Sequence, residues 1–287
     1  MDKKKIIWLA SYPKSGNTWF RVILSNILSE TDNPTDINEL VETPIASSRF
    51  IFDNLTGTSA SDLTVQEINN LRPKVYTLLS DHSDKDLFLK VHDVWQINKL
   101  GSPIFPKDIT KGVLYFIRNP LDIAASLAFH NSSSILESIK TLNSQSYALC
   151  KNPKKLHNQL YQRISNWSKH VRSWTIESGL PIFTIRYEDL HINPLQTIFE
   201  ALKFINMEVS KKRIIEAIEN SSFKKLKEQE ISNGFKEKPI NATSFFREGK
   251  YNTWKYHLNQ SDITEIVKAH TTIMRRYGYI SKDSDKV

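Results

Sequence analysis

The sequence predicts an α/β fold, a single domain in which a central parallel sheet is flanked by helices. Short, almost continuously apolar runs at 5–11 and 112–118 are typical of strands buried on both faces of such a sheet. Each run is followed by a segment whose apolar residues have helical spacing, as in βαβ units. The 287 residues show neither an internal repeat nor a clear linker, so we expect one domain over 1–287 with a core at about 5–280.

The N-terminal half alternates strands with helices. The apolar run IIWLA predicts a strand at 5–11, and apolar residues recur every three or four positions over 17–29, which predicts a helix. Residues 30–62 are rich in Asp, Thr, Ser, Asn and Pro, and we expect a loop there with short helical pieces. A helix over 64–80 and a strand at 87–93, in LFLKVHD, complete this half.

The C-terminal half opens with a well-marked helix start. Asn119 has the type of an N-cap residue and Pro120 fits the first helical position, so NPLDIAASLAFH predicts a helix. Residues 131–157 are rich in Ser, Asn and Lys and predict a loop or a weak helix. Three aromatic residues at 158–178 indicate a long helix, PIFTIR indicates a strand at 182–187, and helices dominate thereafter.

Composition excludes several classes of protein. The single cysteine, Cys150, excludes an intramolecular disulfide framework and a multi-cysteine metal site, and it favours a cytoplasmic location. No HExxH motif or clustered ligand set occurs, so we expect no metal. No apolar run approaches the ~18–20 residues that span a bilayer, so we expect no membrane insertion. The apolar part of MDKKKIIWLA is too short for a secretory signal.

The net charge of +8 comes from short basic runs that are scattered along the chain. No zinc-finger spacing or aromatic-rich RNA-binding signature accompanies these runs. We therefore expect no nucleic-acid partner, and the positive field favours small anionic ligands.

The stretch SYPKSGNTW, at 11–19, lies between the first strand and the first helix. It matches neither the Walker A motif nor the dinucleotide-binding motif, since no two glycines lie close enough. The amides of a first helical turn still lack intrahelical partners and attract anions. Gly16 allows close backbone approach and Lys14 adds a positive charge. Taken alone, the stretch fits a phosphate site and an ordinary turn with a surface lysine equally well.

Two further constellations point to a catalytic pair and to a phosphate-binding site. Lys90 and His92 are two positions apart at the end of a predicted strand, where open α/β sheets bind their ligands. Arg118 ends the next strand and Ser126 lies two turns into the following helix, and both side chains suit a phosphate monoester. The alternatives are a structural histidine and a capped helix that tolerates a serine.

Five motifs in order along the chain resemble those of the cytosolic-type sulfotransferases, a family with a P-loop-kinase-like architecture. They are YPKSGNTW, LKVH, RNPLDIAAS, RYEDL and FREGKYNTW. The stretch around the first motif also resembles bacterial members that sulfate natural products. The family transfers a sulfuryl group from 3′-phosphoadenosine 5′-phosphosulfate (PAPS) and leaves 3′-phosphoadenosine 5′-phosphate (PAP).

The resemblance implies a nucleotide site drawn from the whole chain. Its implied members are Lys14, Ser15, Gly16, Asn17 and Thr18 around the 5′-phosphosulfate; Trp19, Tyr187 and Phe223 beside the adenine; Arg118, Ser126, Arg247 and Gly249 at the 3′-phosphate; and Ser221 and Phe246. The implied catalytic residues are His92 as general base, Lys90 as its charged neighbour and Lys14 at the leaving oxygen. Without the family, Trp19, Tyr187 and Phe223 would be interpreted as core residues.

Departures from the family pattern lie near the C-terminus. Glu248 stands where the family has lysine, and an acid there would repel a 3′-phosphate unless it turned outward. Asn252 and Thr253 replace a Gly-Asp pair before Trp254, so the turn is expected to differ. The short dimerisation motif of the animal enzymes has no counterpart, which leaves the oligomeric state open.

We therefore predict a PAPS-dependent sulfotransferase that acts on a hydroxyl or an amine of a small-molecule acceptor. The polar, aperiodic stretch 229–247 is predicted to be a mobile lid over the site. Two alternatives stay open, a P-loop-type phosphotransferase and a non-catalytic nucleotide-binding module. The first would require a Walker-type motif and an acidic magnesium ligand, and the second would have no use for His92.

Overall fold

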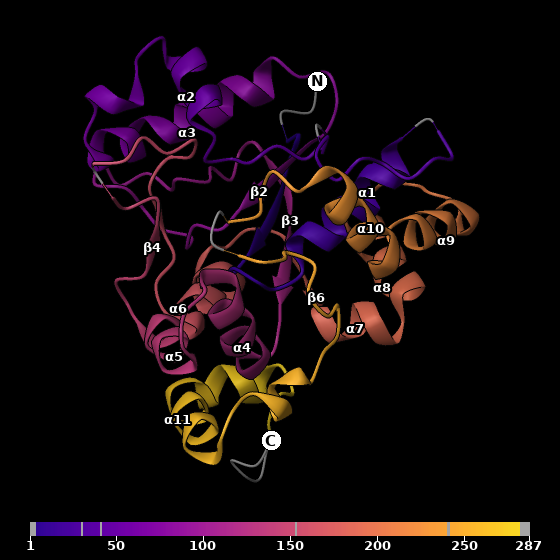
Figure 1. Cartoon of the computed structure of the whole chain (residues 1–287). Coiled ribbons are helices and arrows are strands. Elements are labelled where there is room, and N and C mark those ends of the chain that lie inside the picture. The colour runs from indigo at the N-terminus through magenta and orange to yellow at the C-terminus, as the bar shows by residue number, and fades with distance from the viewer. Residues whose placement is uncertain (1–3, 30, 41, 153, 240–241, 282–287) are drawn as a thin grey trace. The chain divides into compact units, whose positions relative to one another are not determined.

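The structure is a computed structural model that describes residues 4–29, 31–40, 42–152, 154–239 and 242–281 (Figure 1). The chain is divided into two compact units, each built from three separate segments. Unit 1 comprises Met1–Tyr12, Thr43–Tyr115 and Gln145–Thr184, and unit 2 comprises Pro13–Glu42, Phe116–Ser144 and Ile185–Val287. The single domain over 1–287 stays a prediction.

A central parallel sheet confirms the predicted α/β class. Its four strands have the order β2-β1-β3-β6. They are β1 (Ile6–Ser11), β2 (Leu87–Val91), β3 (Thr110–Ile117) and β6 (Ile182–Arg186). β1 and β2 pair in parallel from Ile6↔Leu87 to Ala10↔Val91, and every residue of β1 is buried, as its apolar run predicts. β2 is two residues shorter than the prediction, so His92 follows the strand directly.

Unit 1 adds helices and a short antiparallel pair to the sheet. Its elements are α2 (Arg49–Thr56), η1 (Ala60–Asp62), α3 (Val65–Asp81), β4 (Ala148–Leu149), β5 (Gln162–Arg163), α6 (Trp167–Arg172) and the π-helical turn η2 (Ser173–Glu177). The Trp8 ring makes edge contacts with Tyr76 and Phe105 in the core. The predicted helix over 64–80 is confirmed as α3, which begins with a capping box formed by Thr64 and Glu67.

The prediction of one long helix over 158–178 is wrong. Only the part from Trp167 onward is helical, because Ser165 has a left-handed φ of 65° and Asn166 caps α6 by accepting a bond from Lys169 N. The residues before that cap form β5, which pairs with β4. These backbone partners lie more than ten positions away, so local periodicity does not reveal them.

Unit 2 is mainly helical. Its elements are α1 (Asn17–Leu28), α4 (Pro120–Asn131), α5 (Ile135–Asn143), α7 (Tyr187–Ile192), α8 (Pro194–Phe204), α9 (Lys211–Asn220), α10 (Phe223–Asn233), η3 (Thr253–Tyr256) and α11 (Gln260–Arg276). The start of α4 is as predicted, with Asn119 accepting from Leu121 N and Pro120 in the first helical position. The segment predicted to be weakly helical contains α5, which also begins with a capping box.

The predicted lid segment is partly ordered by side-chain contacts within unit 2. Its first residues belong to α10, which ends at Asn233. The Glu230 carboxylate accepts bonds from the amides of Phe245 and Phe246, and Arg21 forms an ion pair with Glu237 at 2.6 Å. Residues 240–241 lie outside the described part, and the lid role stays a prediction.

Candidate functional site

The loop between β1 and α1 has an unusual backbone. Lys14 and Gly16 have φ angles of 70° and 94°, and a non-glycine residue in this left-handed region is strained. Gly16 is the N-cap of α1, so no side chain caps the helix, and its first turn carries no acid. The positive end of α1 is therefore available to an anion.

Several buried side-chain polar atoms of unit 2 have no hydrogen-bond partner among the described residues, and two of them belong to predicted phosphate-binding residues. These two are Oγ of Ser15, a residue that is 1% exposed, and Nε of Arg118, a residue that is 8% exposed. Leaving such a donor unpaired costs about 1–3 kcal/mol. An anionic group would satisfy both atoms, so these residues fit the phosphates of the nucleotide that the sequence implies.

The side chain of Arg118 contacts residues from three of the other predicted motifs, YPKSGNTW, RYEDL and FREGKYNTW. Its Nη1 donates to the Lys14 carbonyl at 3.1 Å and its Nη2 donates to the Lys250 carbonyl at 3.0 Å. Its guanidinium lies 4.2 Å from the centre of the Tyr187 ring. The carbonyls orient the side chain without neutralising it, so Arg118 keeps its charge for a ligand.

Two glycines are required where aromatic rings lie against the backbone. A Cβ on Gly16 would lie 2.5 Å from the Tyr187 ring, and a Cβ on Gly249 would lie 2.1 Å from the Phe223 ring. Both glycines also have positive φ angles, 94° and 58°. The structure thus brings Gly16 to Tyr187 and Gly249 to Phe223, and their membership of one nucleotide site stays a prediction.

An aromatic cluster surrounds Trp19. Its ring lies 6.0 Å from Tyr187 and 4.7 Å from His191, which in turn lies 5.5 Å from Tyr251. Burial, and then the charge of Arg118, lower the pKa of His191 to about 4, so this ring is neutral at neutral pH. His191 was missed by sequence reasoning, although it follows Tyr187 by four positions and so shares its helix face.

Arg247 forms an ion pair with Glu248, the acid that stands where the family has lysine. Its Nη1 lies 2.9 Å from Oε1 of Glu248, and its guanidinium lies 3.7 Å from the centre of the Phe129 ring. Glu248 also lies 3.8 Å from His257 Nε2. Burial is the main cause that lowers the pKa of Arg247, and the charge of Arg118 lowers it further. The charge of Glu248 opposes this shift, so Arg247 already has an anionic partner in the structure.

The turn that replaces the family Gly-Asp-Trp is held by a carboxylate on α4. The buried side chain of Asp122 accepts bonds from the amides of Asn252 and Trp254, and its Oδ1 lies 3.3 Å from Oγ1 of Thr253. Asp122 lies within the motif RNPLDIAAS, but the sequence alone does not predict this contact.

The remaining predicted nucleotide residues have different surroundings. Asn17 and Thr18 lie in the first turn of α1, and Ser126 is half-buried on α4. The Ser221 hydroxyl already accepts a bond from Asn26, and Phe246 packs in a hydrophobic cluster with an exposure of only 6%. These last two have structural partners.

In unit 1, His92 is held in a defined tautomer. Its Nδ1 lies 2.9 Å from the Ser11 carbonyl and 3.2 Å from the Ser11 hydroxyl. A carbonyl only accepts, so Nδ1 carries the proton and the lone pair of the neutral ring is on Nε2. Lys90 is buried inside β2, and its backbone bonds to Pro44 and Ala46.

The turn after β2 is fixed by His170. Nε2 of His170 donates to the His92 carbonyl at 3.0 Å, so its Nδ1 accepts from the Tyr115 hydroxyl at 2.8 Å. Burial lowers the pKa of His170 to about 4, although the His92 carbonyl favours the protonated ring. Both nitrogens of His170 are thus engaged in the neutral form.

Asp93, the next residue, is anchored from two sides. Its carboxylate receives two bonds of 2.8 Å from Arg72, and both side chains are 1% exposed. Its carbonyl accepts from Trp174 Nε1 at 2.9 Å. The backbone that carries His92 is therefore held rigidly within unit 1.

The family model of the sulfotransferase domain matches residues 4–278. The chain belongs to the sulfotransferase family. Curated relatives include 3-beta-hydroxysteroid sulfotransferase of Cavia porcellus, 25% identical over 93% of this chain and 83% of that protein. Cytosolic sulfotransferase 1 of Arabidopsis thaliana is 26% identical over 88% of this chain and 73% of that protein. Sulfuryl transfer is thus the chemistry of this chain.

Solved structures share the fold of this sulfotransferase. Mouse sulfotransferase SULT7A1 complexed with PAP has a TM-score of 0.61 and 15% identity, covering 97% of this chain and 86% of that one. Retinol dehydratase in complex with androsterone and the inactive cofactor PAP has a TM-score of 0.62 and 16% identity. The match covers 98% of this chain and 83% of that one. Neither comparison concerns a bacterial origin, which stays a prediction.

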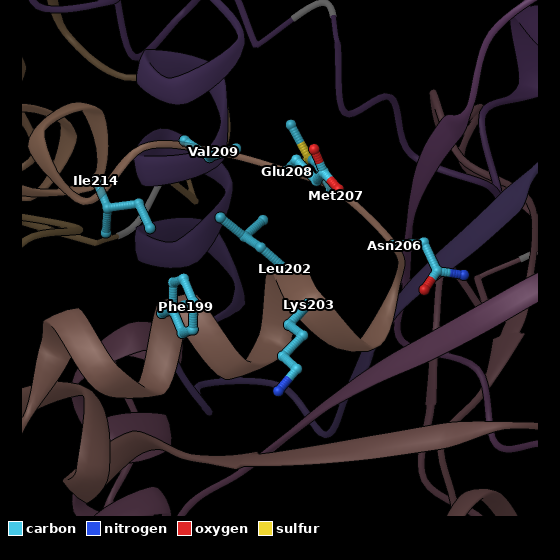
Figure 2. A pocket seen from close by; sticks show the side chains of 8 residues that line it. All are labelled: Phe199, Leu202, Lys203, Asn206, Met207, Glu208, Val209 and Ile214. Carbon is cyan, nitrogen blue, oxygen red and sulfur yellow. The ribbon is translucent and has the colours of Figure 1, made fainter.

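A surface pocket of about 330 Å³ lies in unit 2 of the sulfotransferase. Figure 2 shows side chains from α8, the following loop and α9 around it, namely Phe199, Leu202, Lys203, Asn206, Met207, Glu208, Val209 and Ile214. None of these is a predicted site residue, so the pocket is not assigned to the acceptor.

The described residues of the sulfotransferase contain neither a cluster of metal ligands nor a membrane-spanning helix. No group of three His, Cys, Asp or Glu side chains there could hold a metal ion. None of the helices in that part has both the length and the apolar character for a bilayer crossing. The metal-independent reaction, the cytoplasmic location and the lack of a nucleic-acid partner stay predictions.

Proposed function

We propose that the sulfotransferase transfers a sulfuryl group from PAPS to a hydroxyl or an amine of a small-molecule acceptor, with His92 as general base. The observation that carries the proposal is the pair of buried atoms Ser15 Oγ and Arg118 Nε, unpartnered within the described part of the chain, beside the uncapped start of α1. When bound, PAPS supplies a sulfuryl group that is already attached to a good leaving group.

The nucleotide roles rest on charge and shape within unit 2. Ser15 and the first amides of α1 donate to the 5′-phosphosulfate, and Arg118 with Arg247 binds the 3′-phosphate. Trp19, Tyr187 and Phe223 offer ring faces to the adenine. Engagement of Arg247 by the 3′-phosphate requires that it exchange its contact with Glu248, because the two anions compete for one guanidinium.

The catalytic roles follow from where the proton and the charges must go. His92 takes the proton of the acceptor at Nε2, since the contact with Ser11 leaves the lone pair there. Lys14 neutralises negative charge on the leaving oxygen, and Lys90 stabilises the charge on the sulfuryl oxygens. None of these roles requires a metal ion.

The acceptor is sought by mass spectrometry. Incubation with PAPS and a panel of alcohols, phenols, sugars, peptides and amines should add about 80 Da to one class, which names the reaction class. Hydroxysteroids come first in the panel because similar proteins of Cavia porcellus are named for them. A panel that gains no mass in any class would contradict the proposal and favour a module that only binds nucleotide.

His92→Ala tests the mechanism. We expect single-turnover transfer to fall by about 10²–10⁴-fold while PAP affinity, measured by calorimetry, is unchanged. Lys14→Ala should lower both rate and affinity, because its charge meets the nucleotide before and during transfer. His82→Ala is the matched control, since His82 is exposed at the end of α3. Transfer at the parent rate by His92→Ala would exclude His92 as the base.

A further inference from the structure

The buried helix α4 carries polar residues at every fourth position. They are Asp122, Ser126 and His130, which lie along one side of a helix whose other central residues are apolar and buried. Asp122 holds the turn at Asn252, and Ser126 is a predicted nucleotide residue. The proposed reaction assigns no role to His130.

His130 contacts the loop lysine. Its Nδ1 lies 3.2 Å from Nζ of Lys14, and both residues belong to unit 2. An ammonium group only donates, so Nδ1 is the acceptor and the proton of the neutral ring is on Nε2. The contact therefore orients the charge of Lys14 but does not cancel it, whereas a carboxylate in the same place would cancel it.

A second group confines the same ammonium. Nζ of Lys14 lies 4.3 Å from the centre of the Phe245 ring, and the rings of Phe245 and His130 are 5.8 Å apart. The Phe245 backbone is in turn fixed to α10 by Glu230. The flexible lysine side chain is thus held by a nitrogen lone pair from α4 and an aromatic ring from the C-terminal segment.

We propose that His130 is a positioning residue that holds the Lys14 ammonium in the orientation needed at the leaving oxygen. The inference rests on the proposed function, since it gives His130 a role only through Lys14. A mobile ammonium would have to be ordered anew in each turnover, whereas the contact with His130 orders it in advance.

His130→Ala should lower the transfer rate by about 10- to 100-fold and change PAP affinity by less than about 3-fold, because the lysine charge stays but loses its orientation. His130→Asn should restore the rate to within about 3-fold, since its Oδ1 occupies the position of Nδ1 and accepts the same bond. The acceptor is the one found in the mass-spectrometric panel, and His82→Ala is again the control.

The double variant Lys14→Ala/His130→Ala separates the explanations. If His130 acts through Lys14, the double variant should be no slower than Lys14→Ala. Additive losses, an unchanged rate in His130→Ala, or a His130→Asn variant as slow as His130→Ala would each overturn the inference; the last would mean that His130 transfers a proton. If Lys14→Ala itself leaves PAP affinity and rate unchanged, the proposed function fails instead.

Discussion

Two buried arginines, Arg72 in unit 1 and Arg118 in unit 2, have opposite surroundings. Arg72 donates to both oxygens of Asp93 and to the Tyr76 hydroxyl, so its charge is neutralised in place. Arg118 donates to two backbone carbonyls, and its Nε has no partner among the residues that the structure describes. A buried arginine paired with a carboxylate stabilises architecture, whereas one held by carbonyls keeps its charge for a ligand.

The largest effect is expected from Arg72→Met. Removing one partner of a buried ion pair leaves the Asp93 carboxylate uncompensated, which should lower the free energy of unfolding by about 3–5 kcal/mol. Urea denaturation measures the loss. Adding Asp93→Leu should recover much of it, because the unpaired charge is removed as well. A loss below about 1 kcal/mol would mean that water reaches this pair, and the contrast with Arg118 would disappear.

The pH dependence of the unfolding free energy tests His170, the buried histidine of unit 1 whose two ring nitrogens are both hydrogen-bonded. The folded-state pKa of His170 is about 4, below its ordinary value of 6.5, so the unfolded chain binds more protons between these pH values. The contribution of neutral His170 to the free energy of unfolding is complete above pH ~6.5 and is lost on acidification. At pH 5 the loss is about 2 kcal/mol. Unfolding free energies at pH 7, 6 and 5 should show a shallower slope in His170→Gln. Equal slopes would contradict the assignment.

Arg118→Ala should affect ligand binding more than folding. We expect PAP affinity to fall by about 10- to 100-fold, the scale of a charge-assisted bond. Arg118→Lys should keep part of that affinity, since it retains the charge but not the planar group. Calorimetry gives the affinity, and urea denaturation of the ligand-free protein gives the stability. Equal losses of stability in Arg118→Ala and Arg72→Met would show that Arg118 is also structural.

The smallest effect is expected from Ser15→Ala. The change removes a buried hydroxyl that has no partner in the described part of the chain, so the ligand-free protein should be unchanged or more stable by up to about 1 kcal/mol. PAP affinity should fall by about 3- to 10-fold, as for the loss of one hydrogen bond. A gain of stability without any loss of affinity would mean that Ser15 does not contact the nucleotide.

Features with local causes were predictable from the sequence. Apolar runs indicated the strands, and the cap residue Asn119 marked the start of a helix, because these signals lie within one turn of the element. The error at 158–178 had a distant cause, the pairing of β5 with β4, together with the left-handed Ser165. Local spacing contains no information of that kind.

The site divides in the same way. Lys14, Gly16 and Arg118 could be predicted as site residues because a loop, a helix start and a strand end are visible in the sequence. Their contacts could not be predicted, since Lys14 contacts His130, which lies 116 positions further along the chain. The one available signal for His130 was its spacing of four from Ser126, which a pattern of apolar residues does not record.

The π-helical turn Ser173–Glu177 makes the contacts with the backbone at 92–93 sensitive to the number of residues in the turn rather than to the identity of their side chains. A π turn holds one residue more than an α turn, and here it follows α6 directly. His170 before the turn and Trp174 within it both bond to the backbone at 92–93. Deleting one residue would restore α geometry but rotate these two side chains apart by about 100°. Sequences that keep this fold should therefore vary in composition at η2 but conserve its number of residues.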